Sequence, residues 1–345
     1  MRLVNSPAPE KQTFISFARG LSMFTIVIYH FLKYAPLPPL LAKANLLGGS
    51  GIYIFLLASS YGLYFSKTTS WFNFYLKRFR KVLLPYYIGL TLIVLINHFV
   101  TIYPESWQAY VSHLLLYKMF YEPYMGSYGP HFWFISTIVQ FYLVWPLLLK
   151  LSESLKTIPL LSLAFGISIL YSVLIFKLGV QDDRIWHSSA IQYFWVFALG
   201  LAMAKEQWLP QLLRLGLFRY ALLFVFGAGI SLAINKFAGA QGGIFNDYFM
   251  FIAYFSACVI LYLISQKIQL ISRFVLWIES FSYSLYIVHL FVFSCYMKSM
   301  SETRISLYEV PIVLALAIGI ALVFDKAVNL LLNLKLRRAR PALGI

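Results

Sequence analysis

The sequence predicts an all-α protein, a polytopic bundle of about ten transmembrane helices. Of its 345 residues, 61% are hydrophobic and only 12% are charged, whereas an ordinary soluble domain carries about 25% charged residues. The apolar runs are long and continuous rather than alternating, and each is close to the ~20 residues that a helix needs to cross a bilayer core. A soluble protein could not bury this much apolar surface, so the bilayer is the predicted solvent for most of the chain.

Ten apolar segments meet this length requirement. They are 13–34, 48–66, 82–102, 130–150, 158–177, 188–205, 217–236, 244–266, 280–299 and 308–334. No long loop divides the chain into separate parts, so we expect residues 1–345 to form a single membrane-embedded domain. Basic tails at 1–12 and 335–345 would flank it in the cytoplasm.

The distribution of Lys and Arg predicts the orientation, because cytoplasmic loops of membrane proteins are enriched in both residues. With the N-terminus inside, eighteen of the 28 Lys and Arg residues fall in inner segments and eight in outer segments, while Arg19 and Lys326 lie within spans. Both termini are therefore expected in the cytoplasm, which requires an even number of spans.

The formal charge of +16 is explained by these basic inner loops, and we expect no nucleic-acid partner, because no aromatic and basic motif for single strands is present. Cys258 and Cys295 both lie within apolar spans. They support neither a disulfide framework nor a cysteine-rich metal site, and no metal is expected.

Arg19 and His30 lie in the first span, 13–34, and are the most informative residues of the chain. Ionisable side chains at membrane depth persist mainly where they face a protein interior or a wet cavity. Eleven residues are about three helical turns, so both side chains share one helix face, roughly 16 Å apart. His30 could accept a proton from a hydroxyl nucleophile or form a hydrogen bond in the core, and Arg19 could bind a phosphate or extend to the headgroups.

Two further patterns contain polar side chains that could form a site. The basic run Lys77–Lys81 precedes the third span and would attract either a polyanion or anionic lipid headgroups. In the ninth span, Ser282, Tyr286 and His289 fall on one helix face, and such a stripe either lines a site or joins helices.

The segment between the third and fourth spans, 103–129, is too polar to cross the bilayer. Its tyrosines at 110, 117, 121 and 124 share roughly one helical face. This face is either an interfacial aromatic belt or a platform on which sugar rings stack.

Four segments in this order resemble the acyltransferase-3 family of integral membrane acyltransferases, in its short form without an attached esterase-like domain. The first is Arg19 followed after ten residues by His30. The others are Gly51–Tyr61, the basic run that ends at Pro85, and the pair formed by Phe132–Pro146 and Phe281–His289. The chain departs from the family pattern at Val82, where the second arginine of the basic motif is expected and Lys81 stands one residue earlier.

The resemblance implies transfer of an acyl group, most often acetyl, from a cytoplasmic acyl-coenzyme A to a hydroxyl of a cell-surface or lipid-linked glycan. It implies a multi-pass protein of a bacterial cytoplasmic membrane, with acetyl-coenzyme A as co-substrate. His30 would be general base or acyl carrier, and Arg19 would orient the donor or the acyl carbonyl. The implied donor-binding residues are Arg78, Lys81, Arg80 and Ser59. The implied acceptor-binding residues are His131, Trp133, Tyr142, Tyr286 and His289.

A transporter or flippase for a lipid-linked sugar or envelope precursor is the alternative function. Ten spans and polar helix faces suit it equally well. It gives no reason for the four-part resemblance, and only an acyltransferase would release free coenzyme A thiol in the presence of its acceptor.

Overall fold

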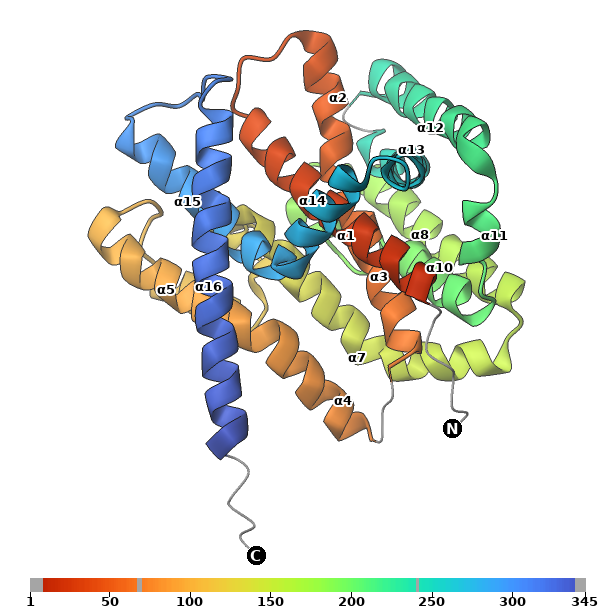
Figure 1. Cartoon of the computed structure of the whole chain (residues 1–345), viewed down its shortest axis with the longest axis horizontal. Helices are drawn as coiled ribbons and strands as arrows, with labels where there is room; N and C mark the ends of the chain where they lie inside the picture. The colour runs from red at the N-terminus through yellow and green to blue at the C-terminus, as the bar shows by residue number, and fades with distance from the viewer. Residues whose placement is uncertain (1–8, 67–69, 240–241, 339–345) are drawn as a thin grey trace, which may run out of the picture.

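The computed structural model describes residues 9–66, 70–239 and 242–338, with the side chains of 9–12 and 333–338 left out. Regular structure in these residues is helical throughout (Figure 1), which confirms the predicted all-α bundle. The side chains of the two expected basic tails, 1–12 and 335–345, lie outside the described residues. The orientation of the termini stays a prediction.

Eight helical segments in the described residues are long and apolar enough to cross a membrane, and the protein is an integral membrane protein. They belong to α1 (Pro9–Leu32), α2 with α3 (Pro39–Gly49, Gly51–Tyr64), α4 with the π-helix η1 and α5 (Trp71–Arg78, Phe79–Leu83, Leu84–Val100), η4 with α7 (Pro130–Phe132, Trp133–Ser154), α8 (Thr157–Leu178), α12 (Gly216–Phe237), α13 (Gly243–Ser265) and α16 (Val310–Arg338).

The other two expected spans differ from simple membrane-crossing helices. The ninth is the second half of a bent pair, α14 (Gln269–Ser280) and α15 (Ser282–Ser299), whose axes meet at 78°. The sixth, expected at 188–205, contains turns up to residue 193 and then α10 (Phe194–Lys205). Twelve residues of α-helix are only about 18 Å long, too short for a bilayer core of ~30 Å.

Short helices complete the connections between these segments. They are α6 (Trp107–Leu114), η2 (Lys118–Phe120), η3 (Glu122–Tyr124), α9 (Arg184–His187) and α11 (Leu209–Leu213). The segment 103–129, expected outside the bilayer, is thus folded into short helices and turns between α5 and α7.

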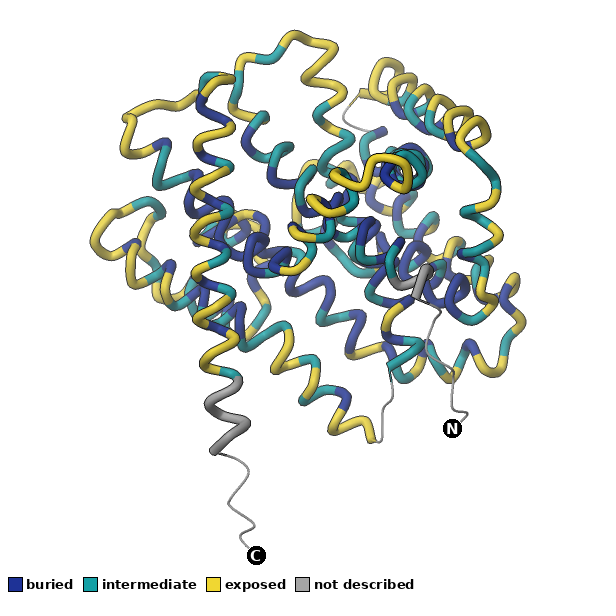
Figure 2. Tube along the Cα trace, viewed as in Figure 1, coloured by how far each residue is buried: buried dark blue, intermediate teal, exposed yellow. Residues whose placement is uncertain are grey.

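Central and peripheral helices differ in how much of their surface the protein itself covers (Figure 2). In α1 and in the α7 span, 56% of the most apolar window is buried, compared with 17% in α12 and 28% in α16. The uncovered residues of α12 and α16 are mostly large and apolar, among them Phe218, Val225 and Val323. Lipid tails are the solvent that such faces require, so α12 and α16 form the rim and α1 and α7 lie at the centre.

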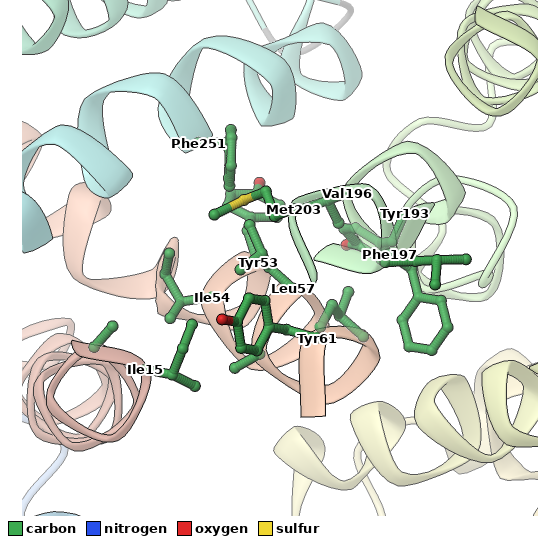
Figure 3. Close-up of a cluster of buried hydrophobic side chains, with 14 of the residues drawn as sticks. Ile15, Tyr53, Ile54, Leu57, Tyr61, Tyr193, Val196, Phe197, Met203 and Phe251 are labelled. Atoms are coloured by element: carbon green, nitrogen blue, oxygen red, sulfur yellow. The ribbon is translucent and has the colours of Figure 1, made fainter. Parts of the chain in front are cut away.

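The short helix α10 is held in the centre by close packing against α3. Leu57 and Tyr61 of α3 lie beside Val196 and Phe197 of α10 (Figure 3), and all four side chains are buried. A Cβ atom on Gly200 would lie 2.2 Å from the carbonyl oxygen of Leu57. Small residues permit this approach, and close contact is what joins helices in lipid. Because protein surrounds α10, its short length does not need to match the bilayer.

Candidate functional site

One cavity of about 590 Å³ lies among α1, α3, α7 and α15 and reaches α4, η1, α9 and α13. Arg19 and His30 both line it, as their shared helix face predicts. The cavity is therefore at least as long as the distance of about 16 Å between them along α1. We call the part near Arg19 the basic end and the part near His30 the histidine end.

The basic end is formed by Arg19 of α1 with Lys77, Arg78 and Lys81. The π-helix η1 adds one residue to the turn that follows Arg78, and π-bulges often occur at functional sites. Lys81 lines the cavity, and so does Val82, which stands at the position where the family pattern has its arginine. The guanidinium of Arg78 lies 5.8 Å from the ring centre of Tyr142. Arg80 is exposed and is not part of the cavity wall.

Arg19 is held by an ion pair that its sequence surroundings do not reveal. Its Nη2 lies 2.9 Å from Oε1 of Glu279, at the end of α14. A Cβ atom on Gly20 would lie 2.2 Å from the carbonyl oxygen of Val275 and 3.0 Å from Cβ of Glu279. The glycine beside Arg19 therefore lets α14 approach α1 and bring the carboxylate to the guanidinium.

The histidine end contains a directly hydrogen-bonded pair, His30 and His289. Nδ1 of His289 lies 3.0 Å from the carbonyl oxygen of Leu285 and 2.9 Å from that of Tyr286. Carbonyl oxygens only accept, so this nitrogen carries the proton, and Nε2 of neutral His289 is an acceptor. Nδ1 of His30, 2.9 Å away, must then donate. This assignment leaves Nε2 of His30 unprotonated, as a general base requires.

His131 is the third histidine of this end, and its ring packs at 4.8 Å from that of His289. The hydroxyl of Tyr286 donates to the backbone carbonyl of His131 at 2.7 Å. Both ring nitrogens of His131 are buried without a hydrogen-bond partner among the described residues. Buried polar atoms are seldom unpaired, and His131 is among the residues that line the cavity.

The turn before His131 is fixed by a buried lysine, Lys118, which is 1% exposed. Its Nζ donates to the carbonyl oxygens of Ser127 and Gly129, each at 2.9 Å. Tyr128 and Gly129 have φ angles of 47° and 134°, in the region that L residues disfavour. The lysine thus stabilises a strained turn that delivers His131 to the cavity.

A buried carboxylate, Asp247 of α13, also lines the cavity. Its Oδ1 accepts from the hydroxyl of Tyr53 at 2.5 Å, and its Oδ2 accepts from Nε2 of Gln192 at 3.0 Å and lies 3.5 Å from Nε2 of His187. Sequence reasoning missed Asp247, His187, Arg184 and Glu279. For Asp247 a signal was available in the sequence, because an acid within the first turns of an apolar helix needs a partner.

The structure brings most of the sequence-predicted site residues to one cavity. Nine of them line it: His30, Arg19, Arg78, Lys81, Ser59, His131, Trp133, Tyr142 and Tyr286. His289 is not among the lining residues but forms a hydrogen bond with His30, which lines the cavity. Arg80 is exposed and does not line the cavity. The catalytic and binding roles assigned to these residues stay predictions.

Comparison with known proteins gives one family. The model of an acyltransferase domain, that of the acyltransferase-3 family, matches residues 12–326. No curated protein and no solved structure matched the chain. The matched residues contain every part of the cavity described above. The chain therefore belongs to the acyltransferase-3 family and is a membrane acyltransferase.

Proposed function

We propose that the protein transfers an acetyl group from cytoplasmic acetyl-coenzyme A to a hydroxyl of a cell-surface or lipid-linked glycan. The observation that carries the proposal is the single cavity that joins four cationic side chains to the His30–His289 pair. A polyanionic donor and a neutral nucleophile need different surroundings. This cavity offers cations at one end and an unprotonated imidazole at the other.

The donor binds at the basic end in this proposal. Arg19, Lys77, Arg78 and Lys81 line that end, and guanidinium and ammonium groups bind phosphate oxygens through charge-assisted hydrogen bonds. Glu279 holds the guanidinium of Arg19 in one direction. The thioester arm of the donor then extends along α1 toward His30.

His30 acts as general base at the other end. Its Nε2 takes the proton of the acceptor hydroxyl while the hydroxyl oxygen attacks the thioester carbonyl carbon. The carbon–sulfur bond breaks, and the imidazolium returns the proton to the departing thiolate of coenzyme A. The acceptor oxygen gains the acetyl ester. His289 stabilises the imidazolium, because its Nε2 accepts a hydrogen bond from Nδ1–H of His30 throughout the reaction.

The experiment compares surface glycans, by mass spectrometry, from cells that lack this protein and carry wild type, His30→Gln or His98→Gln. His98 is a matched control, since its side chain is 71% exposed and lies outside the cavity. We expect one acetyl mass on a defined glycan with wild type and His98→Gln, and a loss of about 10²-fold or more with His30→Gln.

Two measurements give this comparison its meaning. Immunoblots of the membrane fraction verify that each variant is present at the wild-type level. Purified protein should release coenzyme A thiol from acetyl-coenzyme A only when an acceptor is added. Acylation by His30→Gln at the wild-type rate would remove His30 from the mechanism, and glycan movement without thiol release would identify a flippase.

A further inference from the structure

Arg184 and His187, the first and last residues of α9, are two cavity-lining side chains that the proposed transfer does not use. The guanidinium carbon of Arg184 lies 4.9 Å from the ring centre of Trp133. An arginine stacked on an indole keeps its N–H groups free at the edge of the plane. Arg184 is an exposed residue that lines the cavity beside Trp133, so its N–H groups are accessible to a bound molecule.

The short segment that carries Arg184 lies between the helices α8 and α10, and hydrogen bonds fix its backbone in place. Hydrogen bonds from three other elements hold its backbone. They join Ile185 N to Glu122 Oε2 at 3.0 Å, the Tyr171 hydroxyl to Trp186 O at 3.0 Å, and Thr137 Oγ1 to Ser188 O at 2.7 Å. A surface loop without a role seldom has such fixation, and binding residues are often carried on loops positioned by a rigid scaffold.

The charge of Arg184 is not neutralised by the protein. Among the described residues, no carboxylate lies within ion-pair distance of its guanidinium. The one acid among the described residues that line the cavity, Asp247, already accepts hydrogen bonds from Tyr53 and Gln192 and lies 3.5 Å from Nε2 of His187. A guanidinium that lines a cavity and has no carboxylate partner in the described residues has the chemistry to bind an anion.

We propose that Arg184 binds a carboxylate or phosphate group of the glycan acceptor, so that the acetylated unit is anionic. The inference rests on the proposed function, because it concerns the acceptor of the same reaction. The donor phosphates already have four cations at the basic end, whereas Arg184 shares the cavity wall with Trp133 and Asp247. Trp133, Tyr53 and Tyr193 supply aromatic surface around the bound anion, which suits a sugar ring.

The first test is the composition of the glycan unit that loses its acetyl group when the protein is absent, measured by tandem mass spectrometry. A unit with a carboxylate or a phosphate on the acetylated sugar or its direct neighbour is the expected result, and its mass distinguishes the two sources. An acetyl group on a unit without either anion overturns the inference but leaves the proposed function intact. If no glycan loses an ester, the proposed function itself has failed.

The second test uses Arg184→Gln, Arg184→Lys and the control Arg304→Gln, which removes an exposed arginine away from the cavity. Loss of a hydrogen-bonded charge pair corresponds to about 10- to 100-fold. We expect Arg184→Gln to raise KM for the identified acceptor by this factor, with KM for acetyl-coenzyme A unchanged. Arg184→Lys should recover part of the loss. An equal rise in both KM values, or none, would contradict the assignment.

Discussion

Replacing Lys118 by Met should remove a pH dependence from the stability of the protein. Burial lowers the pKa of Lys118 from 10.5 to about 7, because an ammonium group at 1% exposure has lost its water. Its only polar contacts in the described residues are the carbonyl oxygens of Ser127 and Gly129. These dipoles compensate the charge less well than a carboxylate would.

The sign of the effect follows from proton binding. Between pH 7 and 10.5 the unfolded chain keeps the Lys118 proton and the folded protein has lost it, so the free energy of unfolding rises with pH in this window. Below pH 7 the Lys118 amine is protonated in both states, and this contribution is constant. One pKa unit corresponds to about 1.4 kcal/mol, so the fall from 10.5 to about 7 amounts to roughly 5 kcal/mol over the window.

The assay is unfolding of the detergent-solubilised protein, followed by tryptophan fluorescence at several pH values from 6 to about 10. Lys298→Met is the matched control, since Nζ of Lys298 also donates to two backbone carbonyls, those of Val100 and Thr101, but the residue is exposed. We expect the rise in stability above pH 7 in wild type and Lys298→Met and a flatter profile in Lys118→Met. Parallel profiles in wild type and Lys118→Met would refute the reasoning.

Two further substitutions test the basic end and the helix packing. Glu279→Gln removes a negative charge beside Arg19, so we expect coenzyme A to bind about fivefold more tightly at low salt and with unchanged affinity at high salt. Titration calorimetry measures this affinity, and weaker binding at low salt would contradict the expectation. Gly200→Ala inserts a methyl group between α10 and α3 and should lower stability by about 1–3 kcal/mol, whereas Gly319→Ala, with open space around it, should not lower the unfolding temperature.

Local helix geometry made one part of the site predictable from the sequence. Arg19 and His30 lie on one helix, and 3.6 residues per turn place both on the same face whatever surrounds them. The same argument places Tyr286 and His289 together on α15. In the structure Arg19, His30 and Tyr286 line one cavity, and His289 contacts His30.

Partners that are distant along the chain could not be predicted. Glu279 meets Arg19 where α14, bent at 78° from α15, packs closely against α1 at Gly20, and a hydropathy pattern contains no information on such a bend. Asp247 meets Tyr53 across almost two hundred residues. The length of the sixth span was also overestimated, since residues 188–193 form turns before α10 begins. These six residues include two serines and a glutamine, and a window of about 20 residues averages so short a polar stretch with the apolar helix that follows it.

The separation between the two ends of the cavity has a consequence for how far a substrate must travel. Arg19 and His30 stand about three turns apart on α1, roughly 16 Å, whereas the hydrocarbon layer of a bilayer is about 30 Å thick. In the proposed transfer, the two ends of the cavity are thus separated by only about half of that thickness. A donor that stays bound by its phosphates at the basic end could therefore bring its thioester to His30 through an extended arm, and the proposed reaction would need no rotation of the donor or of the protein across the bilayer.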